Sequence, residues 1–338
     1  MKKIDFEFHI YEPGLMKYLE TRTEPPMVAE NPRRLIYREG IFIPLTTIPG
    51  HHYTAEDKLC SDAELKLRNM DTVGVDMAVV STGNLIEDLP REDSIKFAKR
   101  TNDLVASMVY KYPDRFIGTA CLPVADVDAS LEELERCAKM GFKVWHTHSN
   151  YGDKHLYDAE FEPLLAKAEE LGMVIYLHPH FSKTPDMLGV GFVYPGAGLG
   201  FGQDVMKTAV RFMVSGAFDR YPGLKMIIGH LGEYFPFILE RIDNRLGGFS
   251  DPLVKMEHVP SYYFKNKNIM VTTSGNFSKA AFECTKSVLG IDSIMFGSDY
   301  PYENYLAGVQ FIESLGLTEE ELEKVFYRNF ETNILGMA

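Results

Sequence analysis

Four side chains of this sequence are of types that bind divalent cations, and each stands where an apolar run ends. Glu7 and His9 stand two residues apart in IDFEFHI, so a strand there would direct both to one face, together with Asp5. His178 ends the run VIYLH, and Asp299 follows SIMFGS. Two imidazoles and two carboxylates suit one divalent metal ion such as Zn²⁺ or Mn²⁺, with positions left open for water or substrate.

A metal site has to be weighed against ordinary structural roles. A single histidine at the end of a strand more often makes a structural hydrogen bond than binds a metal. Polar groups of this kind at the matching ends of the first, fifth, sixth and eighth predicted strands favour the metal site. The predicted ligands are therefore Glu7, His9, His178 and Asp299.

A second pair, His230 and Glu233, follows a further apolar run in IIGHLGE. The spacing allows the Glu233 carboxylate to reach the imidazole, where it would set the tautomer and raise the basicity of His230. Glu233 as a cap of the following helix is the alternative, and the two roles are compatible. Arg241, eight residues after Glu233, could hold a carboxylate through two parallel hydrogen bonds, with Arg245 as the alternative.

Other histidines leave alternatives open. His146 and His148 form an HxH pair that could hold a second metal, but no lysine or acid stands where it could bridge two metals. We therefore expect one metal, with this pair shaping the pocket or serving the structure. His51-His52-Tyr53 is expected to line the pocket or a subunit contact, and the role of His180 stays open.

Short β-branched runs alternate with helical segments along the chain, which is typical of βα units around a parallel sheet. This pattern predicts an α/β fold, a (β/α)₈ TIM barrel formed by residues 1–338 as a single domain, with the active site at the carboxyl ends of the strands. Two excursions interrupt it, residues 11–61 and 247–266. The expected strands are Ile4–Ile10, Asp76–Ser81, Phe116–Leu122, Phe142–His146, Val174–His178, Lys225–His230, Ile269–Thr273 and Ser293–Gly297.

Composition limits the partners. The 338 residues carry a formal net charge of −13, which argues against nucleic acid and anionic membranes and leaves a small molecule as the expected partner. No apolar run reaches the roughly 18 residues of a membrane span, and Met-Lys-Lys leads directly into a strand pattern without a signal peptide. The four cysteines form no CxxC pair, so neither a disulfide framework nor a zinc ribbon is indicated. A cytoplasmic protein is expected.

The ordered set of motifs resembles a known family. Glu7-x-His9, LHP at 177–179, GHLGE at 229–233, TTSGN at 272–276, SDYPYE at 298–303 and the closing RNFETNILGM are similar to the amidohydrolase-related superfamily. Within it, Glu-x-His on the first strand, in place of His-x-His, and TTSGN resemble the metal-dependent nonoxidative aromatic acid decarboxylases. These include γ-resorcylate, 2,3-dihydroxybenzoate and 5-carboxyvanillate decarboxylases.

The resemblance implies roles for the residues already singled out. Glu7, His9, His178 and Asp299 would bind one divalent metal, Zn²⁺ or Mn²⁺, Arg241 would hold the substrate carboxylate, and His230 and Glu233 would assist. Such relatives are commonly dimers or tetramers, and the 247–266 excursion is the candidate contact.

The implied reaction is decarboxylation of an ortho-hydroxybenzoate to a phenol, with Asp299 delivering a proton to the ring carbon. The main alternative is a metal-dependent hydrolase of a lactone or amide, with Asp299 as base. A catalytically silent barrel that serves as a binding protein is a third interpretation. The need for an ortho-hydroxyl group distinguishes the decarboxylase from the hydrolase.

Overall fold

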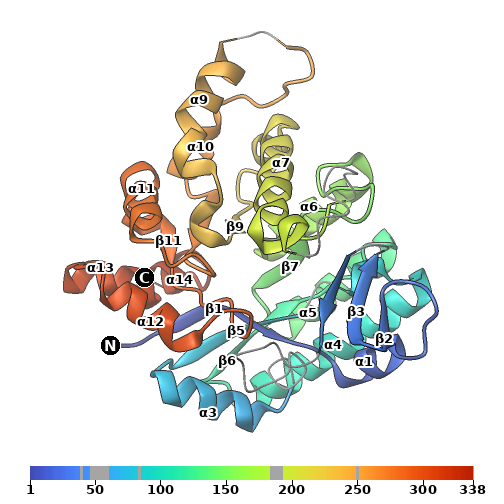
Figure 1. Ribbon diagram of the computed structural model, residues 1–338. Coiled ribbons are helices and arrows are strands. Elements are labelled where there is room, and N and C mark those ends of the chain that lie inside the picture. Colours follow the sequence, from blue (N-terminus) through green and yellow to red (C-terminus); the bar gives the residue numbers. More distant parts are fainter. Residues whose placement is uncertain (39–40, 46–60, 83–84, 183–192, 249–250, 338) are drawn as a thin grey trace.

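Eight parallel strands form the centre of the molecule (Figure 1). The computed structural model describes residues 1–338 except 39–40, 46–60, 83–84, 183–192, 249–250 and 338. The sheet runs in chain order, and backbone bonds from Phe6 to Phe296 and from His9 to Tyr300 bring its last strand against its first. The predicted (β/α)₈ barrel is confirmed. Its strands are β1 (Ile4–Ile10), β5 (Met77–Thr82), β6 (Phe116–Ala120), β7 (Val144–His148), β8 (Val174–His178), β9 (Met226–Ile228), β10 (Ile269–Thr272) and β11 (Ile294–Met295).

Helices follow the strands and pack against the outside of the barrel. Their ends carry the expected signals: Asp62 caps the start of α3, and Thr318 and Glu321 form a reciprocal capping box at α13. The main helices are α3 (Ala63–Val73), α4 (Arg91–Lys111), α5 (Val127–Lys139), α6 (Glu162–Leu171), α7 (Gly200–Val214), α8 (Ala217–Arg220), α9 (Phe235–Gly247), α11 (Lys279–Leu289), α12 (Tyr305–Glu313), α13 (Glu319–Glu323) and α14 (Asn329–Asn333).

The two excursions contain secondary structure of their own. In the first, α1 (Pro13–Leu19) precedes an antiparallel sheet of β2 (Met27–Glu30), β3 (Arg33–Arg38) and β4 (Ile41–Pro44). In the second, α10 (Pro260–Lys265) packs beside α9. His51, His52 and Tyr53 lie outside the described residues. No helix in the described ranges is long and apolar enough to cross a membrane.

A bulge in β1 changes which side chains enter the barrel. Asp5 pairs with Ala78 and Phe8 pairs with Val80, so β1 has one residue more than β5 between these two pairs. Ile4 and Phe6, before the bulge, join the cluster that fills the barrel with Tyr176, while Phe8 and Ile10 pack outward. The simple alternation expected from IDFEFHI is therefore wrong, and Asp5 does not share the surroundings of Glu7 and His9.

Asp5 instead ties the first strand to the segment after the last one. Its Oδ1 accepts hydrogen bonds from the backbone N–H of Glu7 at 3.1 Å and of Ser298 at 2.8 Å. The Ser298 hydroxyl donates to Oδ2 at 2.5 Å. The carboxyl group is fully buried, and this burial raises its pKa to about 7. Asp5 thus fixes the backbone on either side of two predicted metal ligands, Glu7 and Asp299.

Replacing Asp5 should show how strongly this tie holds the barrel together. In Asp5→Ala the two buried N–H groups lose their acceptor, at a cost of about 1–3 kcal/mol each, so the thermal midpoint should fall by several degrees. Asp5→Asn is the matched control, because its amide oxygen can still accept both N–H groups and its NH₂ can donate to Ser298. Equal midpoints for the two variants, measured by circular dichroism, would contradict this role.

Candidate metal centre

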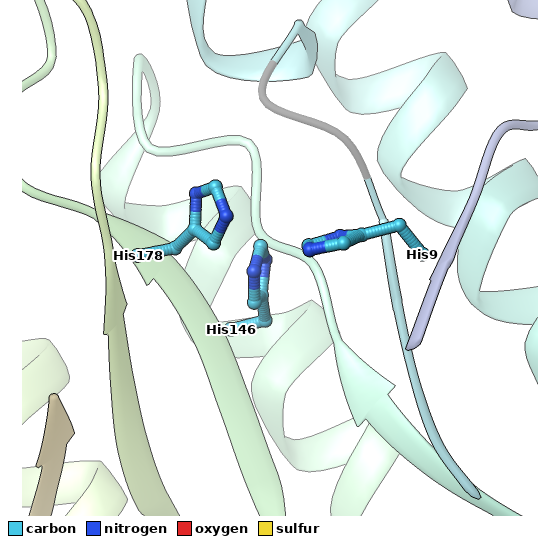
Figure 2. Close-up of side chains that lie close together, drawn as sticks. All are labelled: His9, His146 and His178. Carbon is cyan, nitrogen blue, oxygen red and sulfur yellow. The ribbon is translucent and has the colours of Figure 1, made fainter. Parts of the chain in front are cut away.

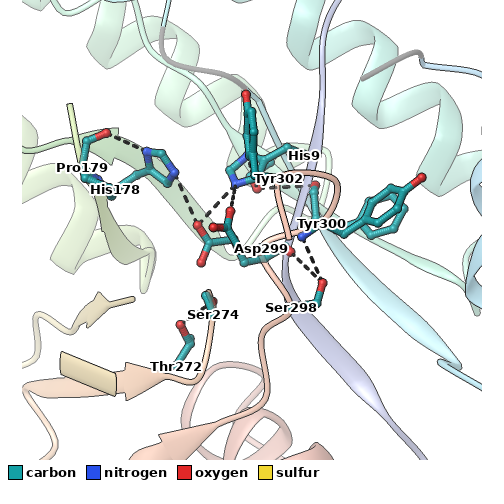
Figure 3. A network of polar contacts seen from close by, with 12 residues as sticks. His9, His178, Pro179, Thr272, Ser274, Ser298, Asp299, Tyr300 and Tyr302 are labelled. Carbon is teal, nitrogen blue, oxygen red and sulfur yellow. Dashed lines mark hydrogen bonds and ion pairs between the residues drawn. The ribbon is translucent and has the colours of Figure 1, made fainter. Parts of the chain in front are cut away.

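The predicted metal ligands meet at one mouth of the barrel, where Figure 3 shows His9, His178 and Asp299 close together. His9 Nε2 lies 3.3 Å from Glu7 Oε1 and 3.4 Å from Asp299 Oδ1. His178 Nε2 lies 3.4 Å from the same Glu7 oxygen. Side chains from β1, from the end of β8 and from the loop after β11 are therefore collected in one place, as the carboxyl ends of parallel strands require.

The Glu7 carboxylate is the most deeply enclosed member of this group. Its side chain is fully buried, and its Oε2 has no hydrogen-bond partner among the described residues. Burial alone would raise the pKa of Glu7, but hydrogen bonds from His178 and His9 hold it well below its ordinary value. Burial likewise opposes the charged form of His9, yet Asp299 and Glu7 raise the pKa of His9 to about 9. A buried anion with an unpartnered oxygen is a site that a cation fits.

His178 is already held in an orientation suited to binding a metal. Its Nδ1 lies 2.8 Å from the carbonyl oxygen of Pro179, which accepts the Nδ1 proton, and its Nε2 faces Glu7. Metal-binding histidines are commonly oriented by such a bond at the other ring nitrogen. Burial lowers the pKa of His178, although its contact with Glu7 opposes this shift.

His230 and Glu233 form the expected pair beside this group. His230 Nδ1 lies 2.6 Å from Glu233 Oε1, and its Nε2 faces Asp299 Oδ2 at 3.9 Å. Burial opposes the charge on His230, but the Glu233 carboxylate raises its pKa to about 10. The first turn of α9 has no side-chain cap, so Glu233 bonds His230 in place of capping that helix.

The backbone around these groups is strained. His230, Leu231 and Glu233 have φ angles of 52°, 61° and 53°, and Asp299 has 60°, in the left-handed region that residues with side chains seldom adopt. Each such residue costs on the order of 1–3 kcal/mol and persists only where its surroundings enforce it. The Leu231 carbonyl accepts a bond from the Thr285 hydroxyl at 3.0 Å, which helps to hold the turn. The strain coincides with the predicted catalytic residues.

The two candidate arginines lie elsewhere. Arg241 and Arg245 are exposed on α9, which projects beyond the barrel in Figure 1, and within the described chain no contact joins either to the metal group. The arrangement of the single chain therefore does not bring Arg241 to the mouth of the barrel.

Sequence reasoning missed the carboxylates that contact two of the remaining histidines, His148 and His180. His148 Nδ1 contacts Glu87 Oε2, and His180 Nε2 lies 2.8 Å from Asp88 Oδ2. Arg38, on β3, approaches His180 Nδ1 at 3.3 Å. Glu87 is buried, which raises its pKa well above the ordinary value. The adjacent acids in NLIEDLP, directly after the second barrel strand, were the available signal.

A parallel barrel with histidines and carboxylates gathered at the carboxyl ends of its strands defines a metal-dependent (β/α)₈-barrel enzyme. The chain belongs to the amidohydrolase family, whose model matches residues 4–329, and the resemblance seen in the sequence is confirmed.

Its relatives include several decarboxylases. Decarboxylase orsB of Emericella nidulans is 34% identical over 306 residues, covering 85% of this chain and 88% of the relative. γ-Resorcylate decarboxylase of Rhodococcus jostii is 31% identical over 307 residues, covering 84% of this chain and 91% of the relative. A solved structure of 5-carboxyvanillate decarboxylase from Novosphingobium aromaticivorans superposes with a TM-score of 0.86 at 26% identity, covering 99% and 96% of the two chains. That structure is complexed with manganese and 4-hydroxy-3-methoxy-5-nitrobenzoic acid.

Gly275, in the TTSGN motif, offers a test of how closely the site is packed. A Cβ at this position would lie 3.0 Å from Asp299 Oδ2 and 3.1 Å from His230 Cδ2. Gly275→Ala should therefore displace the Asp299 carboxylate and weaken Co²⁺ binding by about 10-fold or more, the loss typical when a residue supporting a metal ligand changes.

Gly290→Ala is the matched control for this variant. Gly290 has a φ of 79°, against 62° at Gly275, but a Cβ there would meet nothing within 4 Å. Both variants should lose some thermal stability because an L side chain strains the left-handed backbone. Competition titrations with a chelator would separate the two effects, and equal Co²⁺ affinities for both variants would show that Gly275 does not support the site.

Proposed function

We propose that this protein catalyses the metal-dependent, nonoxidative decarboxylation of an ortho-hydroxylated aromatic carboxylic acid, releasing CO₂ and a phenol. The observation that carries the proposal is the convergence of Glu7, His9, His178 and Asp299 at one barrel mouth, with His230 and Glu233 beside them. Decarboxylases of aromatic acids among the relatives, and a manganese-bound structure among them, support it.

The residues divide the work between holding a cation and moving a proton. One divalent ion, Mn²⁺ or Zn²⁺, held by Glu7, His9, His178 and Asp299, would supply Lewis-acid attraction for the hydroxyl and carboxylate oxygens of the substrate. Glu7 and His9 come from one strand and His178 from another, so the ligands fix the substrate ring relative to the barrel wall.

Asp299 is the proposed proton donor to the ring. It delivers a proton to the carbon that bears the carboxylate, while the ortho-hydroxyl oxygen supplies electron density to the ring. The bond to the carboxyl carbon then breaks, its electron pair returns to the ring, aromaticity is restored and CO₂ leaves. His230, 3.9 Å from Asp299 and bonded to Glu233, is positioned to exchange the proton with Asp299.

We propose that Arg241 binds the substrate carboxylate within a homo-oligomer, a dimer or tetramer. Arg241 is exposed on α9 in the single chain, so this role requires a second copy to bring the guanidinium to a barrel mouth. The neighbouring 247–266 excursion, which includes α10 and the exposed Leu253, supports a contact there.

Two further proposals concern the chain as a whole. Residues 1–338 act as a single domain. The ring of Phe330, in α14, packs against the ring of Phe6, in the first strand, with their centroids 5.9 Å apart, so the two ends of the chain share one core. A cytoplasmic location is supported by the cysteines, since Cys121, Cys137 and Cys284 form no disulfide bond in the described chain.

The function is tested with a panel of hydroxybenzoates that differ only in ring position, incubated with the Mn²⁺-loaded and Zn²⁺-loaded protein. Loss of one CO₂, followed by mass spectrometry, should occur with ortho-hydroxy acids and not with their meta isomers, because only the ortho oxygen can share the cation with the carboxylate. Turnover of lactones or amides, with no loss of CO₂ from any acid, would replace the proposal with a hydrolase.

Asp299→Asn should lower kcat by about 100- to 10,000-fold, the usual contribution of a general acid. Asp292→Asn is the matched control, because Asp292 pairs with Lys324 on the surface at 3.1 Å, away from the barrel mouth. Metal content is measured in parallel so that loss of the cation is distinguished from loss of the proton donor. An Asp299→Asn protein that keeps its metal and its full rate would refute the proposed role.

A further inference from the structure

His146 is a buried imidazole that the proposed function does not use. It lies near the end of β7, with 1% of its surface exposed. Neither of its ring nitrogens has a hydrogen-bond partner among the residues that the structure describes. A neutral imidazole has one donor and one acceptor, and buried polar groups are normally paired, since each unpaired group costs about 1–3 kcal/mol. The side chain therefore needs an explanation other than packing.

The position of His146 supplies one. Ligand atoms of His9, His146 and His178 all lie within 4.8 Å of one another, and Figure 2 shows the three rings gathered at the barrel mouth. The His146 ring centroid is 5.0 Å from that of His178 and 6.1 Å from that of His9. Two nitrogens bound to one zinc ion lie up to about 4.2 Å apart, so a small inward movement of the rings would bring all three into coordination.

The neighbours of His9 indicate one cation position for all of these groups. His9 Nδ1 faces the Ser81 hydroxyl at 3.5 Å, which leaves Nε2 as the nitrogen directed at Glu7 and Asp299. Because a single imidazole nitrogen binds one ion at a time, one ion would serve both the group of three histidines and the group of Glu7, His9 and Asp299.

We propose that His146 is a further ligand of the cation, so that the centre consists of three imidazoles and two carboxylates. This inference rests on the metal centre of the proposed function but not on the reaction. A third imidazole shifts the site towards Co²⁺ and Zn²⁺ relative to Mn²⁺, which prefers oxygen ligands. His146 would therefore set the metal preference of this chain.

His148 provides a matched control on the same strand. It lies two residues beyond His146, is also buried, and its ring centroid is 5.1 Å from that of His146. Neither of its ring nitrogens makes a hydrogen bond among the described residues either, but its Nδ1 contacts the Glu87 carboxyl group, and it belongs to neither group of candidate ligands that includes His9. Replacing either histidine by glutamine removes one buried imidazole from the same strand end, but only His146→Gln removes a proposed ligand.

The experiment measures metal binding and needs no substrate. Wild-type protein, His146→Gln and His148→Gln are freed of metal, then titrated with Co²⁺, Zn²⁺ and Mn²⁺ against a competing chelator. His146→Gln should weaken Co²⁺ and Zn²⁺ binding by at least about 10- to 100-fold, with a smaller loss for Mn²⁺, and should change the visible absorption bands of bound Co²⁺. His148→Gln should keep the wild-type bands and affinities.

Two results of the titrations would overturn the proposal. One is a His146→Gln protein with the cobalt spectrum and affinities of the wild type, and the other is an equal loss in both variants. X-ray absorption of the zinc-loaded wild-type protein provides a test that does not depend on a variant folding: three imidazoles per zinc are expected, and two would refute the third ligand. Because none of these measurements involves turnover, failure of the decarboxylase proposal would be seen separately in the hydroxybenzoate panel.

Discussion

A carboxylate buried inside the barrel is the constraint on which the rest of the site depends. Glu7 is fully enclosed, and a buried charge is tolerated only when other groups compensate it. The bulge in β1 is what turns Glu7 and His9 inward while Phe8 and Ile10 pack against the helices. The orientation of His178, fixed by the Pro179 carbonyl, and the position of His9, whose Nε2 faces both Glu7 and Asp299, place imidazole nitrogens beside this anion.

Backbone strain is concentrated where the chain turns towards that anion. Of the five described non-glycine residues with left-handed φ angles, four lie there, namely His230, Leu231, Glu233 and Asp299, and the surrounding barrel has to enforce these angles. Relaxing the turn at His230–Glu233 would break the 2.6 Å contact between imidazole and carboxylate. The barrel therefore acts as a rigid base on which short loops keep a high-energy arrangement of polar groups.

Some of this arrangement could be predicted from the sequence because apolar runs followed by a polar residue mark the carboxyl ends of buried parallel strands. That reasoning located the eight strands and predicted that Glu7, His9, His178 and Asp299 lie together at one end of the barrel. It failed at Asp5, since a one-residue bulge depends on the register with the neighbouring strand and leaves no trace in hydrophobic periodicity. It also missed the pairing of His148 with Glu87, because which acid meets which histidine depends on loops that are distant in sequence. The antiparallel sheet at β2–β4 went unseen because its proline-rich surroundings are typical of irregular loops.

Closure of the barrel also has a consequence for how the protein is made. The bridge between Phe8 and Tyr300 and the bond from Ser298 to Asp5 join segments from opposite ends of the chain. Contacts of such long sequence separation carry a large loop-closure entropy and form slowly. During synthesis the first strand cannot pair with the last strand until nearly the whole polypeptide has left the ribosome. The metal centre is thus one of the last features to form, and a truncated chain lacks the aspartate that completes it.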